Sequence, residues 1–387
     1  MKKKLSFNMN KFANIPVTLQ KTGHPSIPVD YITIDVREIC HFLYVDAYGS
    51  SPPFSRSQHL FEHYKPFITR DEYFRFVRRG LGSHKEVRIG ESNRWGKAFC
   101  RWFLHEHLGI DYFVHMDEVL DKSILIEGGY KIERSIVAGK SVNGDTPDYI
   151  CAKSAREIYM AEAKGRKDSI SFGNKEFVKW RNQFKRVTIR DSSGLAHSVK
   201  GYIVATRLLT KNEYKTVKPN LLAEDPYTPG LEDFRELDNW PEEIGQMIIA
   251  GHYANFLEIL GMFELGDALR FNYTLPSEIK IPVGVWRSIL PSLRNKRFVG
   301  MFVPCFSNFT LNYLYPELRH ESAVFIGIDL DIFQTVRDAT IVGRRILSQI
   351  EKFPLNDEHR AANISILRDG TIMTPLQTME FDELIYM

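Results

Sequence analysis

The chain has 387 residues, 43% of them hydrophobic, so it can bury a substantial core and is long enough for two or three domains. Its 51 Lys and Arg residues nearly balance its 48 Asp and Glu residues, for a net charge of +3, so any surface for nucleic acid must be a local patch. Its four cysteines, Cys40, Cys100, Cys151 and Cys305, lack paired spacing, which argues against a zinc site or a disulfide framework and favours a reduced cytoplasm. We expect no signal peptide and no membrane span.

The first 84 residues predict an N-terminal accessory region of mixed structure. The apolar run at 31–36 indicates a strand, and the Gly-Ser-Ser-Pro-Pro sequence at 49–53 indicates a polar turn. The stretch 73–79 is aromatic and basic and predicts a helix. We expect this region to serve specificity or oligomerisation.

The middle of the chain begins with an amphipathic helix, predicted over 95–109 and ending at Gly109. Two strands are expected next, at 148–151 and 157–164, joined as a hairpin. Because strand side chains alternate between faces, Glu162 and Lys164 share one face. Ala161 and Ala163 share the other, where small side chains allow a helix to pack closely.

The predicted hairpin brings two carboxylates and a lysine together. Asp148, entered through Pro147, and Glu162 on the neighbouring strand can share a cation. Magnesium prefers hard oxygen ligands, lowers the pKa of a bound water and neutralises charge that develops on phosphorus. Lys164 would orient or deprotonate that water. The alternative is an exposed hairpin with ordinary surface charges, but the apolar run 158–161 leads straight into Glu162, which is rare at a solvated edge.

Pro147, Asp148, Glu162 and Lys164 resemble the signature of the PD-(D/E)xK nuclease superfamily, which includes many restriction endonucleases, Holliday-junction resolvases and RecB-type nucleases. The resemblance implies an α/β (mixed α+β) protein with a restriction-endonuclease-like central core at 85–212, ordered as a helix, three strands, a helix and a strand. It also implies Mg²⁺ as the cofactor, with Mn²⁺ as a substitute, held by Asp148, Glu162 and the carbonyl of Ala163, while Lys164 acts on the water.

The resemblance further implies an accessory acid on the helix before the sheet. Glu91 is the best-placed candidate, because Lys97 stands where resolvase-like members often have Glu, and Glu106 is an alternative. Either carboxylate can also be an ordinary solvated helix position. Gln183 is similar to the glutamine of the RecB-like Gln-x-x-x-Tyr motif, although Val187 replaces the tyrosine.

A second helix is predicted from Asn174, with an apolar face made by Phe177, Trp180, Phe184 and Val187. Its other face and the turn after the catalytic strand are basic. These cations are candidates for phosphate contacts, with a solvated face as the alternative: Arg166, Lys167, Lys175, Lys179, Lys185 and Arg186. A further buried strand is expected at 200–209.

The polar stretch 213–239 contains three prolines and predicts a linker, and 240–387 predicts a C-terminal α/β domain. This domain should open with a long apolar helix near Pro241 and contain strands at 283–286, 297–303 and 323–328. Asp329 and Asp331 follow the last strand. They can form a metal site, lie on a solvated strand end or accept backbone amides in a turn.

Together these features predict a Mg-dependent endonuclease that hydrolyses phosphodiester bonds in DNA. Large regions around a minimal core favour a bacterial restriction or anti-phage defence nuclease, acting in the cytoplasm. The alternatives are an RNA endonuclease, since both nucleic acids offer the same phosphodiester, and a nucleic-acid-binding or assembly subunit of a defence complex. The sequence has no Walker-type phosphate loop, so an ATP-driven step would need a partner ATPase. A homo-oligomer and a defence-subunit partner both stay open.

Overall fold

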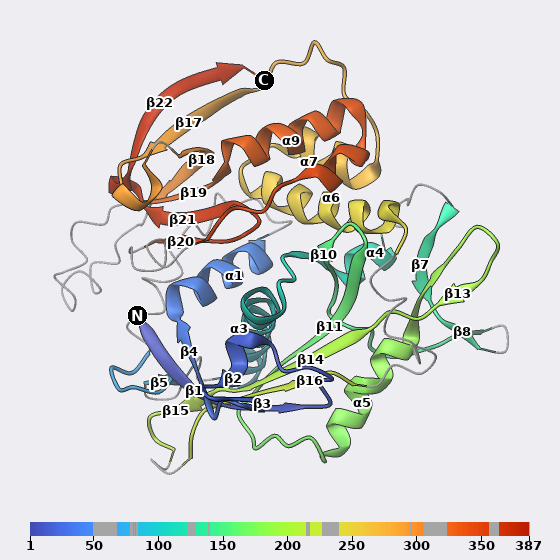
Figure 1. Cartoon of the computed structure of the whole chain (residues 1–387), viewed down its shortest axis with the longest axis vertical. Helices are drawn as coiled ribbons and strands as arrows, with labels where there is room; N and C mark the ends of the chain where they lie inside the picture. The colour runs from blue at the N-terminus through green and yellow to red at the C-terminus, as the bar shows by residue number, and fades with distance from the viewer. Residues whose placement is uncertain are drawn as a thin grey trace. The chain divides into compact units, whose positions relative to one another are not determined.

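The computed structural model describes residues 1–48, 68–77, 80, 82, 84–121, 129–137, 140–213, 217–226, 240–294, 296–304, 323–355 and 364–386. Two compact units make up the chain, one from Met1–Asp46 and Phe67–His252 and the other from Ala47–Pro66 and Tyr253–Met387. Both contain helices and sheets (Figure 1), which confirms the predicted mixed α/β class. In the described part of the chain, no helix is both long and apolar enough to cross a membrane.

The first unit is built on a seven-stranded mixed sheet in the order β4-β1-β16-β14-β11-β10-β6. Strand β11 lies near its centre, antiparallel to β10 and parallel to β14. In sheet order the strands span Tyr31–Asp35, Lys2–Asn10, Asn220–Glu224, Gly201–Arg207, Glu157–Arg166, Tyr149–Ser154 and Tyr112–His115. The strands predicted at 31–36, 148–151, 157–164 and 200–209 are therefore confirmed.

The helices predicted on either side of the β10–β11 hairpin are present. Helix α3 spans Lys85–Phe103 and continues as a π-helical turn, Leu104–Leu108, to Gly109, whose φ of 70° ends the helix as predicted. Helix α5 spans Lys175–Gln183. Within residues 85–212, these two helices and the strands of the large sheet follow in the order α3, β6, β10, β11, α5 and β14, which is the predicted helix, three strands, helix and strand.

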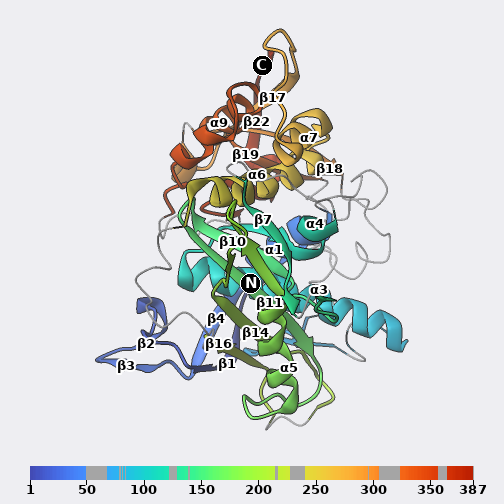
Figure 2. The ribbon, with the colours of Figure 1, turned by 90° about the vertical axis from the view of Figure 1, so that its right-hand side faces the viewer.

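Helices α3 and α5 cover opposite faces of the sheet (Figures 1 and 2). Helix α3 packs against β11 and β14, and a Cβ atom on Gly165 would lie 1.7 Å from the carbonyl oxygen of Ser92, so α3 covers the face of β11 that Gly165 shares with Ala161 and Ala163. The ring of Phe184, just after α5, lies against Gly201 on the other face. Glu162 and Lys164 belong to that second face, because Gly201 pairs with Met160 two residues before Glu162.

Two regions contribute to the large sheet differently from the expected domain organisation. Strands β1 and β4 come from the region 1–84, and β16 lies inside 213–239, which was expected to be a linker. Strand β16 pairs parallel with β1 and antiparallel with β14, because its short apolar run Leu221–Ala223 is buried on forming the sheet. Two of the prolines that suggested a linker, Pro219 and Pro226, lie just outside this strand.

The helix predicted at 73–79 is wrong. Residues Arg75–Phe76 form the short strand β5, which pairs with β15 (Leu209–Thr210). Phe74 and Phe76 are buried, and each ring lies 5.4 Å from that of Trp95 on α3, so packing of the aromatic side chains overrides the helical pattern. The turn predicted at 49–53 lies outside the described residues.

The remaining elements of the first unit surround the large sheet. A three-stranded sheet has the order β13-β12-β7, and two further pairs are β2-β3 and β8-β9. In chain order these strands span Gln20–Lys21, His24–Pro28, Lys131–Arg134, Ile136–Val137, Lys140–Ser141, Val187–Arg190 and Ala196–His197. The short helices are α1 (Val36–Tyr48) and α4 (Met116–Asp121).

The second unit contains a six-stranded antiparallel sheet in the order β20-β21-β19-β18-β17-β22. In chain order from β17 to β22 the strands span Pro282–Ser288, Arg297–Pro304, Ala323–Asp329, Ser365–Ile366, Thr371–Pro375 and Met379–Tyr386, which confirms the three predicted strands. Helix α6 (Glu242–Ile259) begins next to Pro241 as predicted and crosses from the first unit into the second. It is followed by α7 (Phe263–Phe271) and α9 (Leu330–Val342).

Asp329 is the N-cap residue of α9. Its side chain accepts hydrogen bonds from the backbone N–H groups of Asp331 at 3.1 Å and Ile332 at 3.4 Å. The carboxylate therefore stabilises the start of the helix. This corresponds to the predicted alternative in which it accepts backbone amides.

Candidate metal site

The β10–β11 hairpin brings Asp148 and Glu162 to neighbouring positions. Tyr149 pairs with Ala161, so Asp148, one residue before β10, lies across from Glu162. The backbone N–H of Ala163 donates to Asp148 Oδ2 at 2.9 Å, and the Asp148 carbonyl accepts from Met116 N–H at 3.0 Å. Both contacts hold Asp148 at the end of the strand with one carboxylate oxygen directed toward β11.

Glu162 is fully buried, with 0% exposure. Lys164 pairs with its Oε1, whereas Oε2 has no hydrogen-bond partner among the described residues. The same Lys164 Nζ lies 3.7 Å from Asp148 Oδ2. Two carboxylates and one ammonium group therefore share one small site, as the sequence predicted, and the buried carboxylate of Glu162 has unused acceptor capacity.

The electrostatics of the site follow from burial and from these neighbours. Burial, together with the nearby carboxylate of Asp148, raises the pKa of Glu162 to about 8 against the opposing effect of Lys164. Burial alone would lower the pKa of Lys164, but the carboxylates of Glu162 and Asp148 raise it above its ordinary value. Without a cation the site therefore favours a protonated Glu162 beside a charged Lys164.

These residues fit a hard divalent cation. Burying a carboxylate without hydrogen bonds is costly, and a bound cation would supply the missing partner for Glu162. Within the described residues there is no group of three or more His, Cys, Asp or Glu side chains that could hold a metal ion. Two carboxylates are what magnesium commonly takes from a protein, with water and substrate phosphate completing the coordination.

A second lysine, Lys97 on α3, also reaches the site. Its Nζ lies 3.8 Å from Asp148 Oδ1 and 5.8 Å from the centre of the Tyr149 ring. The sequence analysis noted Lys97 only because resolvase-like members of the superfamily often have Glu at this position. Here α3 therefore brings a cation to Asp148. Glu91, the predicted accessory acid, lies earlier on α3 and pairs with Arg94 at 3.0 Å.

Close backbone packing fixes α3 beside β11. A Cβ atom on Gly96 would lie 2.3 Å from the backbone nitrogen of Gly165, and Gly165 has equally little room against Ser92. Only glycine allows two backbones to approach so closely. Gly96 and Gly165 are the sequence neighbours of Lys97 and Lys164, so this backbone contact fixes where Lys97 lies along β11.

A buried polar network that the sequence analysis did not anticipate anchors the residue next to Asp148. Asp46, on α1, lies 3.3 Å from Arg101 Nη1 and 3.3 Å from His115 Nε2, and the hydroxyl of Tyr149 donates to it. Burial would raise the pKa of Asp46, but His115 and Arg101 hold it well below its usual range. Its members lie on α1, α3, β6 and β10, so no local pattern reveals it.

Helix α5 packs as its periodicity predicts. The four predicted core side chains are all buried: Phe177, Trp180, Phe184 and Val187. The helix predicted to run through Val187 ends earlier, however, because Phe184–Arg186 forms a 3-10 turn and Val187 begins β12. Asn174 is the N-cap residue, yet its side chain makes no capping bond and its Oδ1 accepts from Ser171 Oγ at 2.7 Å. Gln183 is buried at the end of the helix, and its Oε1 has no hydrogen-bond partner among the described residues.

The predicted phosphate-binding cations fall into two groups. Lys167, Lys175, Lys179 and Lys185 are exposed. Arg166 and Arg186 have partners within the protein. Arg166 pairs with Glu176 of α5 at 2.6 Å, and Arg186 donates to the carbonyl of Asp145 at 2.6 Å, which holds the loop that leads into Pro147.

The chain was compared with models of protein families, with curated proteins and with solved structures. None of the three comparisons gives a match. The interpretation of the site therefore depends on the geometry of its own residues.

Proposed function

We propose that this chain is a magnesium-dependent endonuclease that hydrolyses phosphodiester bonds in DNA, with a restriction-endonuclease-like core. The observation that carries the proposal is the carboxylate of Glu162, which is fully buried and lies across from Asp148. Its Oε1 pairs with Lys164, and its Oε2 has no hydrogen-bond partner among the described residues. A structural ion pair alone would leave such a carboxylate poorly satisfied, whereas a cation shared with Asp148 would satisfy it.

Asp148, Glu162 and the carbonyl of Ala163 would hold the ion, and manganese would substitute for magnesium. Bound magnesium lowers the pKa of a coordinated water and neutralises charge that develops on the phosphate. Because its pKa is raised, Lys164 is held as an ammonium group, which suits it to donate hydrogen bonds to the attacking water or to a phosphate oxygen. Lys97 adds a second positive charge next to Asp148.

The substrate would reach the site along the exposed lysines of α5 and the turn after β11. These side chains would contact phosphates and would hold the backbone without reading its sequence. The setting that we propose is bacterial restriction or anti-phage defence, because large regions surround a minimal core.

A cleavage assay tests this function. The purified chain is incubated with plasmid, linear duplex, single-stranded DNA and RNA, in magnesium, manganese or EDTA. We expect nicked or linear products that need a divalent cation, and we expect Asp148→Ala and Glu162→Ala each to lower the rate by several orders of magnitude. Cleavage of RNA alone would replace the DNA substrate in the proposal. Unchanged metal-dependent cleavage by both variants would remove the site assignment.

A further inference from the structure

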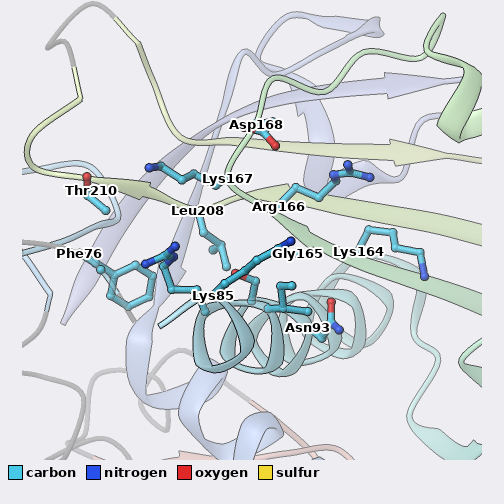
Figure 3. A pocket seen from close by; sticks show the side chains of 14 residues that line it. Phe76, Lys85, Asn93, Lys164, Gly165, Arg166, Lys167, Asp168, Leu208 and Thr210 are labelled. Atoms are coloured by element: carbon cyan, nitrogen blue, oxygen red, sulfur yellow. The ribbon is translucent and has the colours of Figure 1, made fainter. Parts of the chain in front are cut away.

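A pocket lies between the end of β11 and the first turns of α3 (Figure 3). Its volume of about 380 Å³ lies in the range of small-molecule sites, which is about 300 to 1,000 Å³. The 14 lining residues all belong to the first unit and come from the segments 76–80, 85–93, 164–168 and 208–210. Lys164 of the candidate metal site is one of them.

The lining of the pocket is basic. The chain as a whole has 51 basic and 48 acidic residues, but Asp168 is the only acid in the lining, against three exposed cations: Lys85, Arg88 and Lys167. Lys164 and Arg166 also line the pocket, but their side chains pair with Glu162 and with Glu176 of α5. Like charges that gather around one pocket repel each other, so the arrangement favours an anionic ligand.

The start of α3 adds to this preference. Lys85 and Arg88 lie in its first turn with Glu86, although the helix dipole favours acidic side chains over basic ones there. The N-cap residue, His84, makes no side-chain capping bond to that turn. Basic side chains at an uncapped helix start stabilise the folded chain poorly, but they form a good site for phosphate.

The pocket also offers apolar surface. Phe76 and Leu208 line it but are buried, and Ile89 on α3 has 51% of its surface exposed. In Figure 3, Phe76, Lys85 and Thr210 lie at one end of the pocket and Lys164 and Asn93 at the other. A ligand that matches this lining has both a phosphate group and a planar ring.

We propose that this pocket binds one nucleotide unit, with its phosphate held by Lys85, Arg88 and Lys167 and its base against Ile89. A nucleotide of the substrate strand close to the cleaved bond is the favoured occupant, because Lys164 contributes both to the pocket and to the candidate metal site. This choice of occupant rests on the proposed nuclease function. A free nucleotide has the same chemistry, and the experiment separates the two.

The test is fluorescence anisotropy with a labelled, 5′-phosphorylated hexathymidylate in EDTA, over a series of salt concentrations. The pocket variant is Lys85→Glu with Lys167→Glu. The control, Lys2→Glu with Lys280→Glu, makes the same charge change at two exposed lysines outside the pocket. The pocket variant should lose at least about tenfold in affinity and flatten the salt dependence by about 1.4 in log units, whereas the control should stay within about twofold of the wild type.

A second variant tests the apolar part of the pocket. Ile89→Ser should weaken binding several-fold and leave the salt dependence unchanged, because it removes contact with the base and no charge. Thymidine 5′-monophosphate serves as the competitor. If it displaces the hexamer at comparable concentration, the occupant is a free nucleotide, and if it competes far more weakly, the occupant belongs to a strand.

If the pocket variant and the control bind the hexathymidylate with equal affinity, the proposal that this pocket binds a nucleotide is wrong. The experiments distinguish failure of the pocket proposal from failure of the proposed nuclease function. Cleavage is measured in a separate assay, with Asp148→Asn as the variant of the metal site. Pocket-dependent binding by a wild-type chain that cleaves no substrate would remove the nuclease and keep the nucleotide site. If metal-dependent cleavage is lost in Asp148→Asn but binding does not depend on the pocket, the nuclease function stands and the nucleotide site is wrong.

Discussion

Replacing Glu162 with Gln should change how the stability of the metal-free chain depends on pH. Burial beside Asp148 raises the pKa of Glu162 from 4.5 to about 8. Between these two values the folded chain binds more protons than the unfolded chain, so the free energy of unfolding falls as the pH rises. At pH 7 the carboxyl of Glu162 therefore lowers the free energy of unfolding by about 3 kcal/mol relative to its protonated form.

Glutamine has nearly the same shape as protonated Glu and cannot ionise. Glu162→Gln should therefore raise the free energy of unfolding by about 3 kcal/mol more at pH 7 than at pH 4.5. The measurement is urea unfolding in EDTA, followed by circular dichroism, for both proteins at both pH values. The difference between the variant and the wild type at pH 4.5 is subtracted from the difference at pH 7, so any cost of burying the amide that does not depend on pH cancels.

The control is Glu157→Gln on the same strand, where Lys153 pairs with the half-buried carboxylate at 2.9 Å. This substitution should change the free energy of unfolding by less than about 1 kcal/mol at either pH. If Glu162→Gln and the wild type differ by the same amount at pH 4.5 and pH 7, the carboxylate of Glu162 is not held in a costly environment and the argument for a cation there fails.

Four further outcomes are expected. Magnesium should raise the thermal stability of the wild type more at pH 8 than at pH 6, because the ion competes with the proton on Glu162, and a shift that is independent of pH would contradict this. Lys164→Ala should lower the cleavage rate by a factor of about 10² to 10⁴ and leave DNA affinity nearly intact. An equally large loss of affinity in a binding assay would show instead that Lys164 binds a phosphate of the substrate. Reversing Lys175 and Lys179 to Glu should flatten the salt dependence of duplex binding by about 2 in log units, and an unaltered slope would leave α5 as a solvated face. Phe177→Ala, at a fully buried position, should cost about 3 to 5 kcal/mol in urea unfolding, and a cost below about 1 kcal/mol would show that the site repacks.

The sequence alone determined the local elements around the site. Alternation along 157–164 placed Glu162 and Lys164 on one face, and Ala161 and Ala163 on the face that α3 covers. The spacing of Phe177, Trp180 and Phe184 gave the buried face of α5. Side-chain periodicity and the glycine at the end of α3 are properties of neighbouring residues, so they can be read without knowing the fold.

Tertiary structure decided which distant segments meet. Strand β16 looks like part of a linker because its apolar run is short and flanked by prolines, and only pairing with β1 and β14 makes it a strand. The position of Lys97 against Asp148 depends on the contact between Gly96 and Gly165, and the Asp46 network joins four elements. The basic pocket likewise combines the start of α3 with the end of β11. These features arise from long-range packing, in which burial and backbone contact outweigh local propensity, and no pattern along the chain records them.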